Sequence, residues 1–372
     1  MKEIRPSDER LQYMGRIDVS EPDAPHFYWA GSLVQFAFTG TQLAFIIENY
    51  VSYNGLQLGC IIDGKEHVIA LGDADNRYDI PVSGGGVHKC ILFKRQDSTH
   101  SFVLRKILLA DDGDLRELPP LPALKLECYG DSVTAGSVVE AVDCVAKPDP
   151  PVYDSVYDNA WHSYAMQTAR LLGAQVHLVA QGGLALLDHT GWFADGRYGL
   201  ETVYDKLCYF PGQTMTPWDF SRYIPDYVTI AIGQNDQHFD GRDQLLDDDQ
   251  RERWLDTCCG ILQDLMQKYP KAVFILMLTV LMHDEYWETL LDDACERMSS
   301  PRVRRFRFTR SGLATPGHPR IPEQCEMACE LTEFIWSLQE AAAAQAPSRS
   351  DTQPRKAGTR RTKTAGRSGR RD

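Results

Sequence analysis

One serine stands where a hydrolase would place a nucleophile. A short apolar stretch over residues 124–129 ends in Gly130-Asp131-Ser132, on a turn that opens toward a helix. Such a turn holds the hydroxyl above the edge of a sheet, and its backbone N–H groups can stabilise negative charge that develops on a substrate oxygen. The turn is not a G-x-S-x-G elbow, because Thr134 stands at the place of the second glycine. Ser132 is therefore the candidate nucleophile.

The candidate base is His318, which lies in Gly317-His318-Pro319 just before a helical pattern. A neutral imidazole can take the serine proton near neutral pH and return it to the leaving alcohol. The rival is His238, which we interpret as a rim residue open to substrate contact.

Three donors are candidates for an oxyanion hole, namely the backbone N–H groups of Ser132 and Gly182 and the side-chain amide of Asn235. A glycine suits position 182 because the backbone must approach the substrate closely. An amide such as Asn235 donates without titrating. The neighbouring carboxylates Asp131 and Asp236 are interpreted as loop-structuring groups rather than as acid–base groups.

An aromatic side chain often supports a bound sugar, and Trp192 follows the Gly182 turn closely enough to overhang the site. We take Trp192 as the candidate substrate-binding residue. The sequence shows no metal-ligand spacing and no phosphate-cradling loop, so neither a metal nor another cofactor is expected.

Composition limits the class of protein. The 372 residues can form two domains, and no run reaches the 18–20 or so apolar residues of a membrane span. The N-terminus has no apolar signal-peptide region, and the ten cysteines are scattered without a C-x-x-C pattern. We expect reduced thiols and a cytoplasmic location.

The charge is distributed unevenly. Residues 347–372 carry nine Lys or Arg against two Asp, a net charge of +7 that leaves −20 for residues 1–346. A tail without large apolar side chains cannot bury surface, so it is expected to be disordered. The net negative charge of residues 1–346 argues against nucleic acid as the main ligand. The oligomeric state stays open.

Residues 10–117 are typical of antiparallel β structure. Apolar runs recur at 33–38, 43–47, 58–62, 68–71, 89–94 and 101–104, with turn residues between them. Asp63-Gly64 separates two of these runs and predicts a hairpin. We predict a jelly-roll sandwich over 10–117, followed by a stiff Pro-rich linker over 118–123.

Residues 124–346 change to alternating strands and helices. Strands are predicted near 124–129, 176–180, 226–232 and 272–278, and helices over about 161–172, 255–266 and 322–344. This alternation predicts a parallel sheet with helices on both faces.

Four blocks in this region resemble the SGNH (GDSL) hydrolases in their order: Gly-Asp-Ser at Ser132, the strand-end Gly182, Gly233-x-Asn235-Asp236 and His318-Pro319. The resemblance implies a flavodoxin-like SGNH hydrolase domain. It also implies the roles given above to Ser132, Gly182, Asn235 and His318.

The domain order narrows this resemblance to carbohydrate esterase family 2. Residues 29–32, 63–64, 88 and 93–95 fit the family's N-terminal domain in order. Because its members remove acetyl groups from sugar hydroxyls, the resemblance implies a serine esterase of acetylxylan esterase type. Its expected substrates are small O-acetylated sugars or oligosaccharides. Which sugar and which hydroxyl are deacetylated stays open.

One departure affects the mechanism. SGNH enzymes usually carry Asp three residues before the histidine, but here that position is Thr315, and no acid occurs between Ser300 and Pro322. By similarity to family members that use a Ser–His dyad, we predict a dyad in which a backbone carbonyl orients His318. A carboxylate within hydrogen-bond reach of His318 Nδ1 would contradict this.

Two alternatives remain. One is a lipid esterase or thioesterase on the same scaffold. The other is a carbohydrate-binding protein whose site has lost catalysis, for which the missing acid would be the reason.

Overall fold

The structure is a computed structural model that describes residues 1–51, 56–72, 76–98, 100–152, 155–239, 242–313, 316–345 and 369. Residues Met1–Phe334 form one compact unit, and Ile335–Asp372 form a second. The predicted disordered tail, 347–372, lies outside the described residues except for Gly369.

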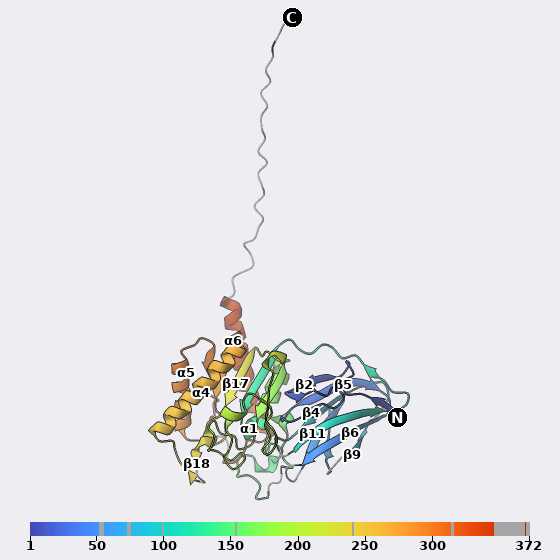
Figure 1. Cartoon of the computed structure of the whole chain (residues 1–372), viewed down its shortest axis with the longest axis horizontal. Coiled ribbons are helices and arrows are strands. Elements are labelled where there is room, and N and C mark those ends of the chain that lie inside the picture. The colour runs from blue at the N-terminus through green and yellow to red at the C-terminus, as the bar shows by residue number, and fades with distance from the viewer. Residues whose placement is uncertain are drawn as a thin grey trace. The chain divides into compact units, whose positions relative to one another are not determined.

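The N-terminal part is a sandwich of two antiparallel sheets (Figure 1). The first sheet runs β3 (Ile17–Asp18), β4 (His26–Phe27), β11 (His100–Leu109), β6 (Gln42–Val51) and β9 (Asn76–Pro81), with β1 (Lys2–Ile4) also on β11. The second runs β12 (Leu115–Arg116), β5 (Leu33–Thr39), β10 (Val87–Lys94), β7 (Gln57–Ile62) and β8 (Lys65–Ala70), with β2 (Gln12–Met14) on β5. The predicted jelly-roll class is confirmed.

Alternation of apolar residues along these strands builds the sandwich core, in which Phe36, Phe45 and Phe102 are fully buried. The hairpin predicted at Asp63-Gly64 joins β7 to β8. Both residues have positive φ, 48° and 85°, as a two-residue hairpin turn of this type requires.

The C-terminal part contains a five-stranded parallel sheet in the order β14 (Gln175–Ala180), β13 (Lys125–Gly130), β17 (Tyr227–Ala231), β20 (Val273–Met277) and β21 (Val303–Arg305). In chain order this is 2-1-3-4-5, the flavodoxin-like arrangement. The predicted α/β class is confirmed. Ligands of such sheets bind beyond the carboxyl ends of the strands, where the strand order reverses beside β13.

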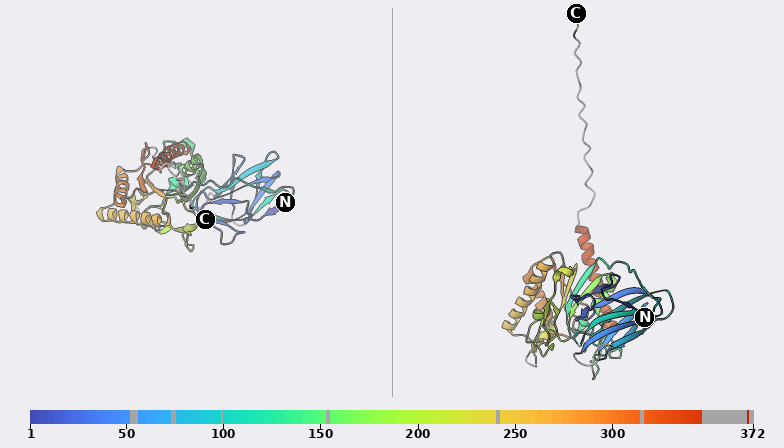
Figure 2. Two further views of the ribbon diagram at one scale, coloured as in Figure 1. Left: turned by 90° about the horizontal axis from the view of Figure 1, so that it is seen from above. Right: turned by 45° about the vertical axis from the view of Figure 1, so that its right-hand side comes forward.

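Helices cover the sheet on both faces (Figure 2). They are α1 (Ser132–Ala135), α2 (Tyr164–Leu172), α3 (Leu200–Val203), α4 (Asp248–Lys268), α5 (Glu285–Met298) and α6 (Ile321–Gln345). Leu255 and Leu262 of α4 share one core with Val228 and Ile230 of β17. The α2 and α6 helices contact each other, since the Thr168 hydroxyl donates to the Ala328 carbonyl.

Short elements complete the described residues. Single 3₁₀ turns lie at Val142–Cys144, Ala160–His162, Phe220–Arg222 and Gln234–Gln237, and small hairpins pair β15 (Lys206–Cys208) with β16 (Thr216–Pro217) and β18 (His238–Phe239) with β19 (Arg242–Asp243). The helix expected from Trp161 begins only at Tyr164, because Ser163 caps its N-terminus. Its predicted end at Gly173 is confirmed by the left-handed C-cap.

The two parts share a buried interface. Arg16, before β3, pairs with Glu127 of β13 at 3.0 Å, and both side chains are fully buried. Tyr129 and Tyr269 donate to the second oxygen of Glu127. Trp29 stacks on Tyr209 with ring centroids 3.7 Å apart. The segment 118–123 contains no helix or strand, and its role as a domain boundary stays a prediction.

All ten cysteines are free thiols. Over the described part of the chain, no helix has the length and apolar content needed to cross a bilayer.

Candidate active site

Ser132 lies directly beyond the carboxyl end of the central strand β13, as the first residue of α1. Its neighbour Asp131 caps this helix by accepting a hydrogen bond from Val133 N–H at 3.0 Å. The first N–H groups of a helix have no intrahelical acceptor, so the N–H of Ser132 is suited to bind an oxyanion. Local sequence therefore fixes the nucleophile and one donor together.

The structure brings His318 to Ser132. Nε2 of His318 lies 2.9 Å from Oγ of Ser132, across 186 positions of sequence. This distance suits transfer of the serine proton. His238, the rival base, instead stacks on Trp192 with ring centroids 3.4 Å apart. The structure thus supports His318 as the base.

The prediction that no carboxylate orients His318 is wrong. Asp149 Oδ2 lies 2.6 Å from Nδ1 of His318, and Asp149 Oδ1 accepts the His318 backbone N–H at 2.8 Å. The carboxylate comes from the coil at Pro148-Asp149-Pro150, not from position 315, which lies outside the described residues. The three residues form a Ser–His–Asp triad in space.

Two neighbours of Asp149 explain how the carboxylate is held. A Cβ at Gly317 would lie 2.4 Å from Asp149 Oδ1, so only glycine permits this approach. The buried Arg320 donates to Asp149 Oδ1 at 2.8 Å and to the His318 carbonyl.

Electrostatics keeps Asp149 ionised. Burial works to raise the pKa of Asp149, but hydrogen bonds and charge from His318 and Arg320 outweigh it and hold the pKa below its usual value. The negative charge can therefore stabilise the imidazolium that forms during catalysis.

Gly182 lies in the turn after β14, but its N–H already has an acceptor. It donates to Oδ2 of Asp97 at 2.8 Å, and Asp97 belongs to the β-sandwich. A Cβ at position 182 would lie 2.6 Å from the same oxygen, which explains the glycine. No local pattern indicates this contact, because it joins residues 85 positions apart.

Asn235, in the 3₁₀ turn after β17, also donates within the protein. Its Nδ2 lies 3.0 Å from the Leu184 carbonyl and 3.3 Å from Asp131 Oδ2. It therefore lies beside the serine turn.

Asp131 and Asp236 are loop-structuring residues, as interpreted from sequence. Asp236 accepts the backbone N–H groups of Leu186 and Leu187 and so shapes the loop that leads to Trp192. Burial raises the pKa of both carboxyls to about 6, and the hydrogen bonds they accept only partly offset this effect.

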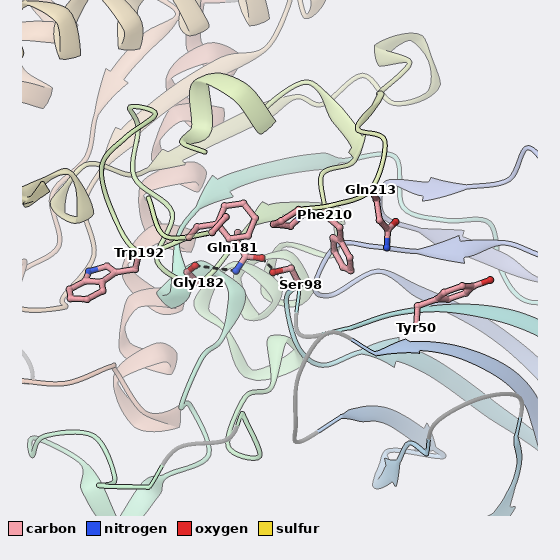
Figure 3. A pocket seen from close by; sticks show the side chains of 10 residues that line it. Tyr50, Ser98, Gln181, Gly182, Trp192, Phe210 and Gln213 are labelled. Carbon is pink, nitrogen blue, oxygen red and sulfur yellow. Dashed lines mark hydrogen bonds between the residues drawn. The ribbon is translucent and has the colours of Figure 1, made fainter. Parts of the chain in front are cut away.

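Trp192 lies on the rim, 59% exposed, with one face against His238. His238 is itself held by Asp243 at 3.0 Å. Figure 3 shows Trp192 at one end of a cavity of about 490 Å³ and Tyr50 of the β-sandwich at the other, with Gly182 between them. This volume falls in the range of ligand pockets.

A second polar cluster lies where the β-sandwich meets the α/β part. Glu66, Glu140 and His162 offer ligand atoms within 4.8 Å of one another, the one such group within the described ranges. However, the Arg95 guanidinium bonds both carboxylates, and the Asn159 amide donates to both. We interpret the cluster as an ion-pair network of the interface.

Fold and site together define a serine hydrolase of the SGNH type. Residues 13–119 match the family model described as carbohydrate esterase 2 N-terminal. A solved family two carbohydrate esterase from Cellvibrio japonicus superposes with a TM-score of 0.78 at 24% identity, covering 91% of this chain and 98% of the other. Residues 13–119 thus resemble the N-terminal domain of carbohydrate esterase family 2, and the overall fold is the one seen in a solved enzyme of that family.

Three further proteins are similar along most of this chain. An acetylxylan esterase / glucomannan deacetylase of Cellvibrio japonicus is 28% identical over 341 residues, covering 88% of this chain and 89% of the relative. The cellulase/esterase CelE of Acetivibrio thermocellus is 26% identical over 87% of this chain, which spans 39% of that relative. A family two esterase from Clostridium thermocellum, solved with cellohexaose, gives a TM-score of 0.75 at 23% identity, covering 89% and 99%.

Proposed function

We propose that the protein is a serine esterase that removes acetyl groups from O-acetylated sugars or oligosaccharides through the triad Ser132, His318 and Asp149. The observation that carries the proposal is the continuous hydrogen-bonded chain from Ser132 Oγ through both nitrogens of His318 to Asp149. This replaces the dyad predicted from sequence. An intact triad also argues against a binding protein that has lost catalysis.

The chemistry follows from the geometry. Ser132 Oγ attacks the acetyl carbonyl carbon while its proton passes to Nε2 of His318. The proton then moves to the leaving sugar oxygen as the carbon–oxygen bond breaks, which leaves an acetyl ester on Ser132. Water, activated by the same imidazole, hydrolyses this ester and releases acetate. Asp149 fixes the tautomer of His318 and stabilises its cation.

The oxyanion would be held by the N–H of Ser132 together with Gly182 N–H and Asn235 Nδ2. Gly182 N–H and Asn235 Nδ2 both donate to protein acceptors, so substrate binding must exchange these acceptors for the carbonyl oxygen.

Carbohydrate as the alcohol part of the substrate is supported by two observations. One relative is named an acetylxylan esterase / glucomannan deacetylase, and a solved family two esterase of similar fold was determined in complex with cellohexaose. Trp192 offers an exposed aromatic face at the cavity, the kind of surface on which sugar rings pack.

The test is acetate release from 4-nitrophenyl acetate, acetylated xylo- and manno-oligosaccharides and a lipid ester, by wild type, Ser132→Ala and His318→Ala. We expect the greatest kcat/KM on a sugar ester and loss of activity in both variants. Preference for the lipid ester would favour the alternative lipid esterase. A folded wild type inactive on every ester would contradict the proposal.

A cytoplasmic location is part of the proposal and favours imported fragments over polymer. Fractionation of the source cells tests it, since recovery of the protein outside the cytoplasm would overturn it.

A further inference from the structure

The loop between β10 and β11 carries a carboxylate of the β-sandwich to the turn that contains Gly182. Asp97 is 5% exposed, and its Oδ2 accepts both Gly182 N–H at 2.8 Å and Gln181 Nε2 at 2.9 Å. The N–H of Gly182 is the donor that the proposed mechanism assigns to the oxyanion. The Asp97 carboxylate therefore accepts the hydrogen bond that this mechanism assigns to the oxyanion.

The loop is held in this place from both sides. Oε1 of Gln181 accepts the backbone N–H of Ser98 at 3.0 Å and the Tyr209 hydroxyl at 2.9 Å. The buried Nζ of Lys94 donates to the carbonyls of Gln96 and Asp97. These hydrogen bonds fix the position of the Asp97 carboxylate.

This contact conflicts with catalysis as it stands. A single N–H cannot make full hydrogen bonds to a carboxylate and to a developing oxyanion at once. Two anions at one donor also repel each other, most strongly in a buried site. Full stabilisation of the transition state therefore requires Asp97 to leave the Gly182 N–H.

A sugar can supply a hydrogen-bond donor that replaces Gly182 N–H at the Asp97 carboxylate. The cavity is lined by Ser98, Gln181 and Gly182, so a ligand bound there lies beside the Asp97 turn (Figure 3). A buried carboxylate that loses a donor pays a large penalty unless another donor replaces it. The hydroxyl groups of a sugar are such donors, whereas 4-nitrophenyl acetate has none.

We propose that Asp97 is a specificity-determining residue that releases the Gly182 N–H when a free hydroxyl of the substrate sugar donates to its carboxylate. The enzyme would thus select acetyl esters that have an unmodified hydroxyl nearby. This inference rests on the proposed function, and the substrate feature that it says is recognised is a free hydroxyl near the acetyl ester.

The test compares kcat/KM for 4-nitrophenyl acetate and for an acetylated xylo-oligosaccharide in wild type, Asp97→Ala and Asp97→Asn. In Asp97→Ala we expect a rise of roughly tenfold on 4-nitrophenyl acetate, part of the hundredfold or so that one oxyanion donor supplies. On the sugar ester we expect a fall of about tenfold, because a charged hydrogen bond is lost. Asp97→Asn, which keeps a neutral acceptor of the same shape, should lie between wild type and Asp97→Ala.

The ratio of the two kcat/KM values is the deciding readout, since a merely structural role would lower both rates together. An unchanged ratio in both variants overturns the proposal, and Asp97→Asn serves if Asp97→Ala does not fold. Asp79→Ala, at an exposed carboxylate of β9, is the matched control and should leave the ratio unchanged. Ser132→Ala separates the two levels: activity that survives it would overturn the proposed function itself, whatever Asp97 does.

Discussion

Nδ1 of His318 lies 2.6 Å from a carboxylate oxygen of Asp149, although 169 residues separate them in the chain. The contact makes the catalytic acid a product of tertiary structure. It is supported from behind by Arg320, which bonds the same carboxylate and the His318 carbonyl.

Asp149→Asn should lower kcat on 4-nitrophenyl acetate by about 10⁴-fold, because the amide holds the wrong imidazole tautomer and supplies no charge. KM should change little, since Asp149 is not among the residues that line the cavity. Steady-state kinetics measure both values. Asp143→Asn, at an exposed carboxylate of the preceding 3₁₀ turn, is the control and should behave as wild type. A loss of only a few-fold in Asp149→Asn would favour the dyad after all.

Trp192→Ala should raise KM for an acetylated oligosaccharide about two- to tenfold, which corresponds to the ~0.5–1.5 kcal/mol of an aromatic contact. The kcat for 4-nitrophenyl acetate should stay the same, because no sugar ring is present to stack. Initial-rate measurements on both substrates provide the comparison. Trp336→Ala, at another exposed tryptophan, is the control. An unchanged KM for the sugar ester would remove Trp192 from the substrate site.

Glu127→Gln should lower the free energy of unfolding by about 3–5 kcal/mol, since it leaves the buried Arg16 cation without its anion. Urea unfolding measures the change. The double variant Arg16→Met/Glu127→Leu should recover much of the loss, because it removes both buried charges. Asp79→Asn, at the exposed pair with Arg77, should cause no measurable shift. Equal effects at the two pairs would contradict the importance of burial.

Lys94 should make stability depend on pH. Burial lowers the pKa of Lys94 to about 7, against 10.5 for a free lysine, and the charges of Asp97 and Asp158 only partly offset it. Between these values the unfolded chain binds the proton and the folded protein does not. The contribution of Lys94 to the free energy of unfolding therefore rises with pH from about 7 to 10.5 and is flat below 7. Urea unfolding across this range should show a smaller rise in Lys94→Met than in wild type, and equal slopes would refute the assignment.

The sequence allowed the strands, the fold class and the residues of the serine turn to be predicted because each is encoded locally. Alternating or continuous apolar runs mark the strands, and Ser132, Gly182 and Asn235 each lie within four residues of the end of one. His318 was found because Gly317-His318-Pro319 resembles the late His-Pro block of the SGNH hydrolases.

Asp149 and Asp97 could not be found in this way. Asp149 lies in a proline-rich coil without periodicity, and only its place between two prolines hints at a rigid position. Asp97 reaches Gly182 through an interface between two different sheet systems. The helix α5 and the three-residue strand β21 were also not predicted, because β21 is too short for a period and acidic residues interrupt the apolar pattern of α5.

The pairing of Arg16 with Glu127 and the stacking of Trp29 on Tyr209 bear on how this chain can be cut or recombined. A fragment starting at Leu124 would keep a carboxylate in its central strand without the cation that neutralises it, and would bare an aromatic ring to water. It would also lack the carboxylate that contacts the Gly182 turn. The α/β part thus depends on the β-sandwich, and a chimera that exchanges the β-sandwich must keep Arg16, Trp29 and Asp97.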